Sequence, residues 1–146
     1  MTESLHIVCP HCHTTNRVRT DQLASAPDCG HCKKPLFTGH PVALDEVAFD
    51  KHLLRNHIPL LVDFWAPWCA PCRQMAPAYV QAAGQLEPRM RVAKVDTEAH
   101  PALGARFQIR SIPTLALFLN GREVARQAGA MGSSDIVRWV QHNMPR

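Results

Sequence analysis

The amino-acid sequence predicts an α/β protein with a mixed central sheet, helices on both faces, and a small N-terminal segment of different character. From residue 42 onward, strand-like and helix-like segments alternate, first as strand–helix pairs and then around a hairpin. Four of the six cysteines lie within the first 32 residues, whereas the first aromatic residue is Phe37. With 146 residues, 46% of them hydrophobic, the chain has material for one sizeable core plus a fragment.

Composition argues against several classes of protein. Charged residues make up 19% of the chain and the formal net charge is +4, which disfavours a disordered tail and a nucleic-acid scaffold held by bulk charge. The longest uninterrupted apolar run, residues 115–119, is far too short to span a membrane. The first six residues contain neither the basic nor the apolar stretch of a secretion signal, so we expect a cytoplasmic protein with no membrane partner.

The first half of the predicted domain begins at residue 42. Asp45 is placed to cap a helix over residues 45–56. A buried strand is expected at residues 60–65, because apolar side chains there occur at both odd and even positions and would therefore cover both faces of the strand. After Cys69, a second helix is indicated by apolar side chains at helical spacing. The apolar positions that indicate these two helices are Val47, Leu53, Leu54, Met75, Ala76, Tyr79, Val80, Ala83 and Leu86.

The second half is expected to add a strand, a short helix, a hairpin and a final helix. The strand is predicted at residues 90–96 and the short helix within residues 98–107. Asn120-Gly121, between two strand-like runs, is a strong hairpin signal. A serine at position 133 or 134 is expected to cap the last helix. The hairpin runs are 115–119 and 123–126, and the final helix carries Ile136, Val137 and Val140.

The N-terminal segment, residues 1–38, contains Cys9, Cys12, Cys29 and Cys32 as two C-x-x-C pairs separated by sixteen residues. A segment with so few large apolar side chains buries too little surface to offset the loss of chain entropy on folding, so it needs a disulfide or a metal site as a cross-link. In a reducing compartment, a four-thiolate metal site explains the pattern better than two disulfides. The spacing is typical of a structural zinc ribbon, and we expect one Zn²⁺, although iron also accepts four thiolates and stays open.

Other interpretations of these cysteines have weaker support. The Cys9–Cys12 pair encloses a dipeptide found in strongly oxidising dithiol proteins, so it could be a second redox centre. We expect no buried strand before it and no amphipathic helix after it, which makes that interpretation weaker. A histidine ligand at position 11, 13 or 31 is not needed, because four cysteines complete the shell. The segment has no basic stripe with interleaved aromatic residues, so we expect no nucleic-acid partner. The basic residues near the cysteines in the sequence, which would offset the negative charge of four thiolates, are Arg17, Arg19, Lys33 and Lys34.

The third C-x-x-C, Cys69-Ala70-Pro71-Cys72, lies where the predicted buried strand passes into a helix. At the helix N-terminus, partial positive charge and free amide groups lower the pKa of a thiol from about 8.5 to roughly 7, so Cys69 is the candidate nucleophile. Cys72, one turn inside the helix, is shielded and close enough to resolve a mixed disulfide. Pro71 fixes the backbone between the two sulfurs and lacks an amide that the first helical turn does not need.

The segment Trp65-Ala66-Pro67-Trp68-Cys69-Ala70-Pro71-Cys72 resembles the active-site region of thioredoxins, and the resemblance extends over roughly residues 42–143. Together with the four-cysteine segment, the whole chain resembles the zinc-binding thioredoxin 2 class. The resemblance implies a thioredoxin fold for residues 42–146, and it implies that Pro113 is a cis-proline facing the active-site sulfurs. Further positions match the family in order: Asp63, Pro77, Lys94, Ile112-Pro113-Thr114 and Gly129.

Three residues near the dithiol have candidate roles. Asp63 is a carboxylate inside an apolar strand, so its pKa should be raised and it is a plausible proton acceptor for Cys72; the plainer alternative is that it ends the strand or caps a neighbour. Lys94 matches the family's lysine near that aspartate, although strand alternation also places lysines toward solvent. Trp68, directly before the nucleophile, is a candidate contact for substrates, whereas Trp65 is expected to pack partly in the core.

We therefore expect a cytoplasmic protein-disulfide reductase that acts on disulfide-containing substrate proteins. The resemblance implies recycling by a flavin-containing, NADPH-dependent thioredoxin reductase. Ala70 stands where the family usually has glycine, and residues between the cysteines tune the redox potential, so an isomerase or oxidant is one alternative. A metal-ribbon binding or chaperone-like protein regulated by its dithiol is the other.

Overall fold

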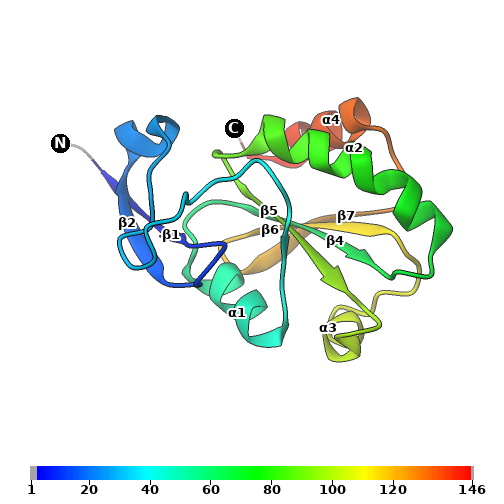
Figure 1. Ribbon diagram of the computed structural model, residues 1–146. Coiled ribbons are helices and arrows are strands. Elements are labelled where there is room, and N and C mark those ends of the chain that lie inside the picture. Colours follow the sequence, from blue (N-terminus) through cyan, green and yellow to red (C-terminus); the bar gives the residue numbers. More distant parts are fainter. Residues whose placement is uncertain (1–2, 146) are drawn as a thin grey trace.

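Residues 42–145, which we call the sheet domain, form the α/β architecture that the sequence predicts (Figure 1). The structure, a computed structural model, describes residues 3–145. One five-stranded mixed sheet has the order β3-β5-β4-β6-β7; β5 is parallel to β3 and β4, β6 is antiparallel to β4, and β7 is antiparallel to β6. The strands are β3 (Val42–Ala43), β4 (Leu60–Trp65), β5 (Arg91–Asp96), β6 (Thr114–Leu119) and β7 (Arg122–Ala128). This arrangement is the thioredoxin fold that the resemblance implies.

Two helices cover each face of the sheet, one pair with α1 and α3 and the other with α2 and α4 (Figure 1). Their bounds are α1 (Glu46–Arg55), α2 (Ala70–Leu86), α3 (Pro101–Arg106) and α4 (Ser133–Asn143). Along β4, Val62 and Phe64 belong to the core under α1 and α3, whereas Leu61 belongs to the core under α2 and α4. Asp63 is two residues from Leu61 in the same strand, so its side chain lies on the same face of the sheet, the one covered by α2.

The predicted elements are found, with differences at their ends. Asp45 caps α1 as expected, since its Oδ1 accepts a hydrogen bond from the amide of Ala48 at 2.8 Å. The short helix begins only at Pro101, because the preceding residues form a turn in which the Asp96 carboxylate accepts two backbone amides. The serine cap on α4 was wrong: Gly132 is the N-cap residue, and no side chain caps that end.

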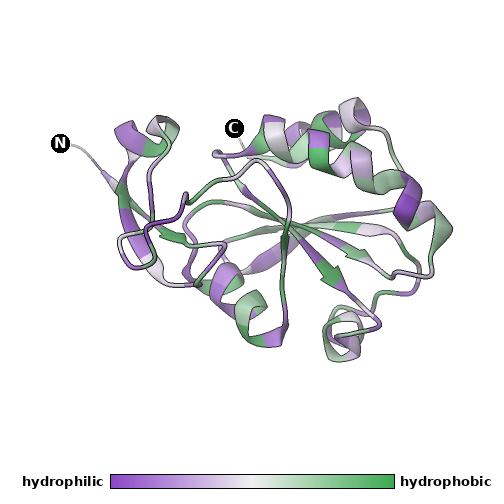
Figure 2. Cartoon of the chain, in the orientation of Figure 1, coloured by the Kyte–Doolittle hydropathy of each residue, from purple (hydrophilic) through white to green (hydrophobic). Residues whose placement is uncertain are grey.

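Two of the apolar positions expected in α1 do not contribute to the core. Leu53 is buried, but Val47 and Leu54 are 67% and 68% exposed. Strand β3 was not predicted, because two residues are too few to show a period. Figure 2 shows the resulting pattern, with many hydrophobic residues along the central strands of the sheet.

Residues 3–38, which we call the ribbon, form a small unit with its own core. Strands β1 (Ser4–Val8) and β2 (Thr15–Arg19) pair as an antiparallel hairpin, followed by a 3₁₀ helix, η1 (Thr20–Ser25). The expectation of no buried strand before Cys9 was wrong, because β1 ends there with Ile7 and Val8 fully buried. No helix follows that pair directly; the next element is β2. The ribbon core includes Ile7, Val18, Leu36, Cys9 and Cys29, together with Ile58 of the sheet domain.

The ribbon packs against α1 and against the end of the sheet at which β4 and β5 begin. This end is far from the start of α2 (Figure 1). The amide of Val8 donates to Oδ1 of Asn56 at 2.7 Å, and the amide of His57 donates to the carbonyl of His6 at 2.9 Å. His52, beside Asn56, is 1% exposed, and burial lowers its pKa to about 2.

None of the helices within residues 3–145 has the length and apolar character that a membrane span requires.

Candidate active site and metal centre

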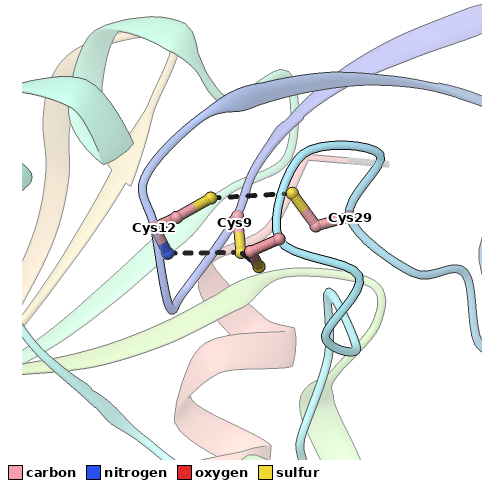
Figure 3. A group of neighbouring side chains, drawn as sticks. Cys9, Cys12 and Cys29 are labelled. Carbon is pink, nitrogen blue, oxygen red and sulfur yellow. Dashed lines mark hydrogen bonds between the residues drawn. The ribbon is translucent and has the colours of Figure 1, made fainter.

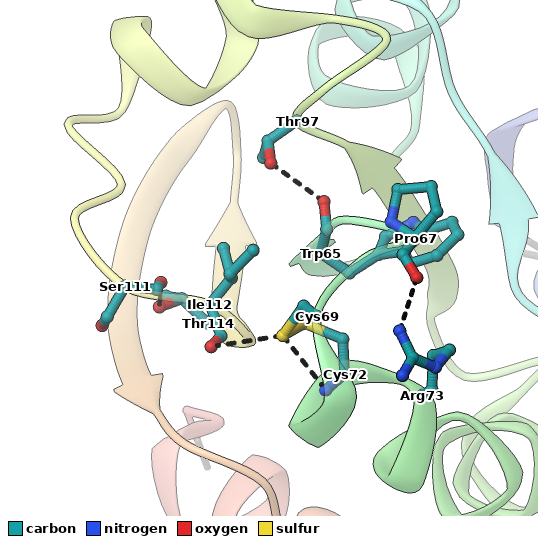
Figure 4. Close-up of a disulfide and its surroundings, with 9 residues drawn as sticks. All are labelled: Trp65, Pro67, Cys69, Cys72, Arg73, Thr97, Ser111, Ile112 and Thr114. Carbon is teal, nitrogen blue, oxygen red and sulfur yellow. Dashed lines mark hydrogen bonds between the residues drawn. A yellow bond between two sulfur atoms is a disulfide. The ribbon is translucent and has the colours of Figure 1, made fainter.

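Cys69 and Cys72 form a disulfide at the start of α2, with Cα atoms 5.2 Å apart (Figure 4). Cys69 is the N-cap residue, and its sulfur accepts a hydrogen bond from the amide of Cys72 at 3.3 Å. A free amide of the first helical turn therefore points at this sulfur, which is the contact that stabilises a thiolate in the reduced protein. Pro71 lies in the first turn, and Pro77 lies inside the same helix, as the resemblance implies.

The loop before β6 faces the disulfide. The peptide bond between Ile112 and Pro113 is cis, and the carbonyl oxygen of Ile112 lies 3.7 Å from the sulfur of Cys69 (Figure 4). Thr114 closes the turn by donating its hydroxyl to the carbonyl of Ser111 at 2.6 Å. The amide of Gly129 donates to the carbonyl of Pro113 at 2.9 Å, and its φ of +99° is a conformation that side-chain-bearing residues rarely adopt.

Residues on both sides of the disulfide shape a groove. Trp68 is 66% exposed and lies at its rim, whereas Trp65 is half-buried. The carbonyl of Trp65 accepts the hydroxyl of Thr97 at 2.9 Å, and Arg73 donates to the carbonyl of Pro67 at 2.7 Å, so these bonds hold the loop between β4 and α2 (Figure 4). The groove has a volume of about 300 Å³. It is lined by Trp68, Thr97, Gly104, Arg110, Ser111 and Ile112.

Asp63 lies beneath the disulfide and is 5% exposed. Its Oδ1 atom is buried and has no hydrogen-bond partner among the residues that the structure describes. Burial raises the pKa of Asp63 to about 7, and the positive charge of Lys94 limits that rise. The pKa was expected to be raised, and a carboxyl with this value exchanges protons readily near neutral pH.

A second hollow, of about 180 Å³, joins Asp63 to the disulfide. Asp63, Cys72 and Lys94 all line it, together with Trp65. Lys94 pairs with Asp63 in the register of β4 and β5, and its ammonium group lies 5.4 Å from the ring centre of Trp65. The six candidate residues singled out in the sequence therefore lie at the disulfide, in the two hollows or in the loop that faces Cys69: Cys69, Cys72, Asp63, Pro113, Trp68 and Lys94.

The four cysteines of the ribbon converge on one point. Their sulfur atoms all lie within 4.8 Å of one another, and Cys12 and Cys29 face each other at 3.6 Å (Figure 3). Cys9 and Cys32 approach to 3.7 Å. These spacings suit a tetrahedral ion with four thiolate ligands.

Backbone and side-chain N–H groups point at the same sulfurs, which fits thiolates better than thiols. The amide of His11 donates to Cys9 at 3.3 Å and the amide of His31 donates to Cys29 at 3.3 Å. The Nδ2 group of Asn16 adds a contact to Cys29 at 3.4 Å. The three nearby histidines provide no ligand atom to the group of four; His13 instead approaches His52 at 3.1 Å.

Sequence reasoning missed the residues that join the ribbon to the sheet domain. Asn56 and Arg91 bond to ribbon backbone atoms, and Glu87 bonds to Arg91 and to the amide of Gly39. Arg91 was placed inside a predicted strand, but nothing in its local pattern indicates that its partners are more than 50 residues away in the chain.

Comparison with known proteins matches both parts of the chain. A family model described as thioredoxin matches residues 40–142, and a zinc-ribbon model described as "Thioredoxin 2, N-terminal" matches residues 8–34. Thioredoxin C-3 of Corynebacterium nephridii is 42% identical over 138 residues, which is 94% of each chain. Thioredoxin 1 of Synechococcus elongatus is 37% identical over 102 residues, 70% of this chain and 95% of that protein. A bifunctional thioredoxin reductase/thioredoxin of Mycobacterium leprae is 36% identical over 107 residues, 73% of this chain and 23% of that protein.

Proposed function

Since the chain belongs to the thioredoxin family, with Cys69 and Cys72 as the redox site of a disulfide reductase, we propose that the residues around this pair divide the reaction as follows. The thiolate of Cys69 attacks one sulfur of a substrate disulfide. The substrate S–S bond breaks, a mixed disulfide to Cys69 forms, and the released substrate thiolate takes up a proton. Its position as the N-cap of α2, with an amide directed at its sulfur, supports Cys69 as the attacking residue.

Cys72 completes the reaction. Asp63 accepts the proton of the Cys72 thiol, and the resulting thiolate attacks the sulfur of Cys69. The mixed disulfide breaks, the second substrate thiolate leaves, and the protein is left with its own disulfide, the state described above. Two electrons have then passed from the dithiol to the substrate. The observation that carries this assignment is the shared hollow between Cys72 and a buried carboxyl whose pKa is about 7.

The groove beside the disulfide supplies the substrate site of this proposal. The Ile112 carbonyl, 3.7 Å from the Cys69 sulfur, is placed to receive an amide of an extended substrate segment. The exposed ring of Trp68 offers apolar area at the rim. Pro113 keeps an amide hydrogen away from this contact, since proline has none.

Lys94 has a supporting role in this scheme. Its charge lies on the strand next to Asp63 and lowers the pKa of a carboxyl that burial raises. Without Lys94 the pKa of the carboxyl would rise further, so a smaller fraction of Asp63 would be ionised near neutral pH and ready to accept the proton of Cys72.

A reductase partner returns the disulfide to the dithiol. We assign this role to an NADPH-dependent thioredoxin reductase, and the bifunctional Mycobacterium leprae protein, which carries both names on one chain, supports the pairing. The four unpaired cysteines of the ribbon support action in a reducing compartment, the cytoplasm. There Cys9, Cys12, Cys29 and Cys32 hold a structural zinc, which stabilises residues 1–38 as a unit distinct from residues 42–146.

Two single variants test the division of roles. Cys69→Ser should abolish reduction of a protein disulfide such as insulin, because the attacking sulfur is gone. Cys72→Ser should still attack but stop at the mixed disulfide, which non-reducing electrophoresis and mass spectrometry would detect as a covalent adduct. Full turnover by either variant, or an adduct through position 72 instead of 69, would refute the assignment. A chaperone-like protein would instead suppress aggregation with both cysteines replaced.

A further inference from the structure

Arg91 is a buried cation at the junction between the sheet domain and the ribbon. It is the first residue of β5, and its side chain is 1% exposed. Its Nη2 group donates to two ribbon carbonyls, those of Val8 and Leu36, each at 2.8 Å. Its Nη1 group donates to the Glu87 carboxylate at 3.2 Å, within an ion pair whose acidic partner is 2% exposed.

These two carbonyls place the guanidinium beside backbone that adjoins the four-cysteine cluster. Val8 directly precedes Cys9, and Leu36 packs in the same core cluster as Cys9 and Cys29. The guanidinium carbon also lies 4.6 Å from the ring centre of Phe37, in the ribbon. Burial lowers the pKa of Arg91, and the negative charge of Glu87 opposes that shift.

The cations expected from the sequence to balance the cluster lie elsewhere. Arg17, Arg19, Lys33 and Lys34 are all exposed. Arg19 pairs with Asp21 at 2.7 Å, and the ammonium group of Lys33 donates to the carbonyl of Gly30. Exposed charges are screened by water and salt, whereas a buried charge close to a buried anion is screened much less. Four thiolates around one dication leave a net charge of about −2, so a cation in the interior matters most.

We propose that Arg91, a residue of the sheet domain, is the buried countercharge of the ribbon's four-cysteine metal centre and a positioning residue of that site. The metal centre is then shared between the two parts of the chain: the ribbon provides the ligands, and β5 provides the charge that stabilises them as thiolates. Glu87 competes for the same cation and adds a negative charge of its own. This inference concerns metal retention and does not depend on the roles assigned at Cys69 and Cys72.

Zinc retention in the full chain tests the proposal. The zinc-loaded protein is titrated with a chromogenic zinc chelator, and the apparent zinc affinity is compared between variants. Arg91→Met should weaken zinc retention by about tenfold or more, the usual effect of removing a residue that supports metal ligands. Arg91→Lys keeps the charge but loses the paired contacts to Val8 and Leu36, so its affinity should fall between those of Arg91→Met and the unmodified chain.

The matched control is Arg89→Met, which removes an exposed arginine two residues away. It should leave the zinc affinity within about twofold of the unmodified chain, as screening of exposed charge implies. Equal zinc affinity in Arg91→Met and Arg89→Met would overturn the proposal.

Glu87→Gln separates charge from packing and serves even if Arg91→Met does not fold. Removing this carboxylate takes away a negative charge near the cluster and leaves Arg91 free to pair with the thiolates. The proposal therefore predicts tighter zinc retention in Glu87→Gln, opposite in sign to the Arg91 variants. Weaker retention in both would mean that the ion pair only holds the two parts of the chain together, and the countercharge role would be wrong.

Discussion

Asp63 and Cys72 line the same hollow of about 180 Å³, although one lies on a strand and the other on a helix. The carboxyl has a buried oxygen without a partner among residues 3–145, and its pKa is raised to about 7 by burial. A neutral-range proton acceptor is therefore placed beside the sulfur that must lose a proton. The first two predictions depend on this pair.

Asp63→Asn should slow resolution of the mixed disulfide without slowing its formation. The amide cannot accept the proton of Cys72, so the second step should slow by about a hundredfold, the low end for loss of a general base. Single-turnover stopped-flow with a protein disulfide separates the two steps. Asp50→Asn, at a half-exposed carboxylate of α1 that pairs with Arg106, is the control and should leave both rates unchanged. Equal slowing of both steps would contradict a role confined to Cys72.

The same substitution should stabilise the oxidised protein more at high pH than at low pH. Burial raises the pKa of Asp63 from 3.8 to about 7, so the folded state holds more protons than the unfolded state between these values. Stability from this residue is therefore lost as pH rises toward 7 and stays lost above it. Between about pH 6 and pH 8 the protein with Asp63 should lose stability equivalent to roughly one pKa unit, and the variant has no such loss. The free energy of unfolding of Asp63→Asn, relative to the unmodified chain, should therefore rise by about 1.4 kcal/mol over this interval. Guanidinium unfolding of both proteins at the two pH values measures it; a constant difference would argue against a buried ionising carboxyl.

Trp68→Ala should impair reduction of protein disulfides more than reduction of a small aromatic disulfide. Trp68 is 66% exposed beside the groove, so a protein substrate bound there would cover the indole ring and a small molecule would not. Loss of such a contact costs about 1 kcal/mol or more, so KM for the protein substrate should rise about fivefold. Val47→Ala, a similarly exposed apolar residue on α1, should change neither KM. Equal effects on both substrates would mean that Trp68 acts on the dithiol itself.

Ala70→Gly should shift the reduction potential by less than about 30 mV. Ala70 is exposed at the first position of α2, and its methyl group adds no charge and no hydrogen-bond donor near Cys69. Equilibration against glutathione measures the potential, and we expect the unmodified chain near the roughly −270 mV of thioredoxin. A potential at or above about −180 mV would favour an isomerase or oxidant instead.

Removal of zinc should destabilise the sheet domain as well as the ribbon. The ribbon core includes Ile58, and Arg91 and Asn56 bond to ribbon backbone atoms, so loosening the cysteine cluster disturbs both sides of the junction. Treatment with a chelator should lower the Tm by about 3 °C or more, equivalent to about 1 kcal/mol for a chain of this length. Hydrogen exchange should rise in β1 and at the start of β5; a rise confined to β1 would mean that the two parts unfold independently.

Local signals in the sequence were enough to predict most elements of the sheet domain and the Cys69–Cys72 dithiol, whereas Pro113 and Lys94 were singled out by the family resemblance. The pairing of Cys69 with Cys72 follows from a strand passing into a helix, and the environment of Asp63 follows from an acid in an apolar strand. The cysteines of the ribbon were predicted equally well, because their ligand spacing is local.

The junction between the two parts was not predictable in the same way. The contact between Arg91 and Val8 joins residues 83 positions apart, and neither residue is unusual for its own strand. A buried arginine is recognisable only once its partners are placed. Helical spacing likewise placed Val47 and Leu54 in the first helix, but it does not show where a neighbouring element ends, and both side chains are exposed.

The placement of Arg91, Glu87 and Asn56 also limits how the chain can be divided for experiments. All three are buried, Arg91 and Asn56 bond to ribbon backbone atoms, and Glu87 bonds to Arg91. Cutting the chain after residue 38 would leave a domain that still contains the redox dithiol. At the opposite end of that domain, Arg91 and Asn56 would lose their ribbon partners, and they and Glu87 would become accessible to solvent. Such a fragment differs from a thioredoxin that never had a ribbon, so the two parts are consecutive in sequence without being interchangeable modules.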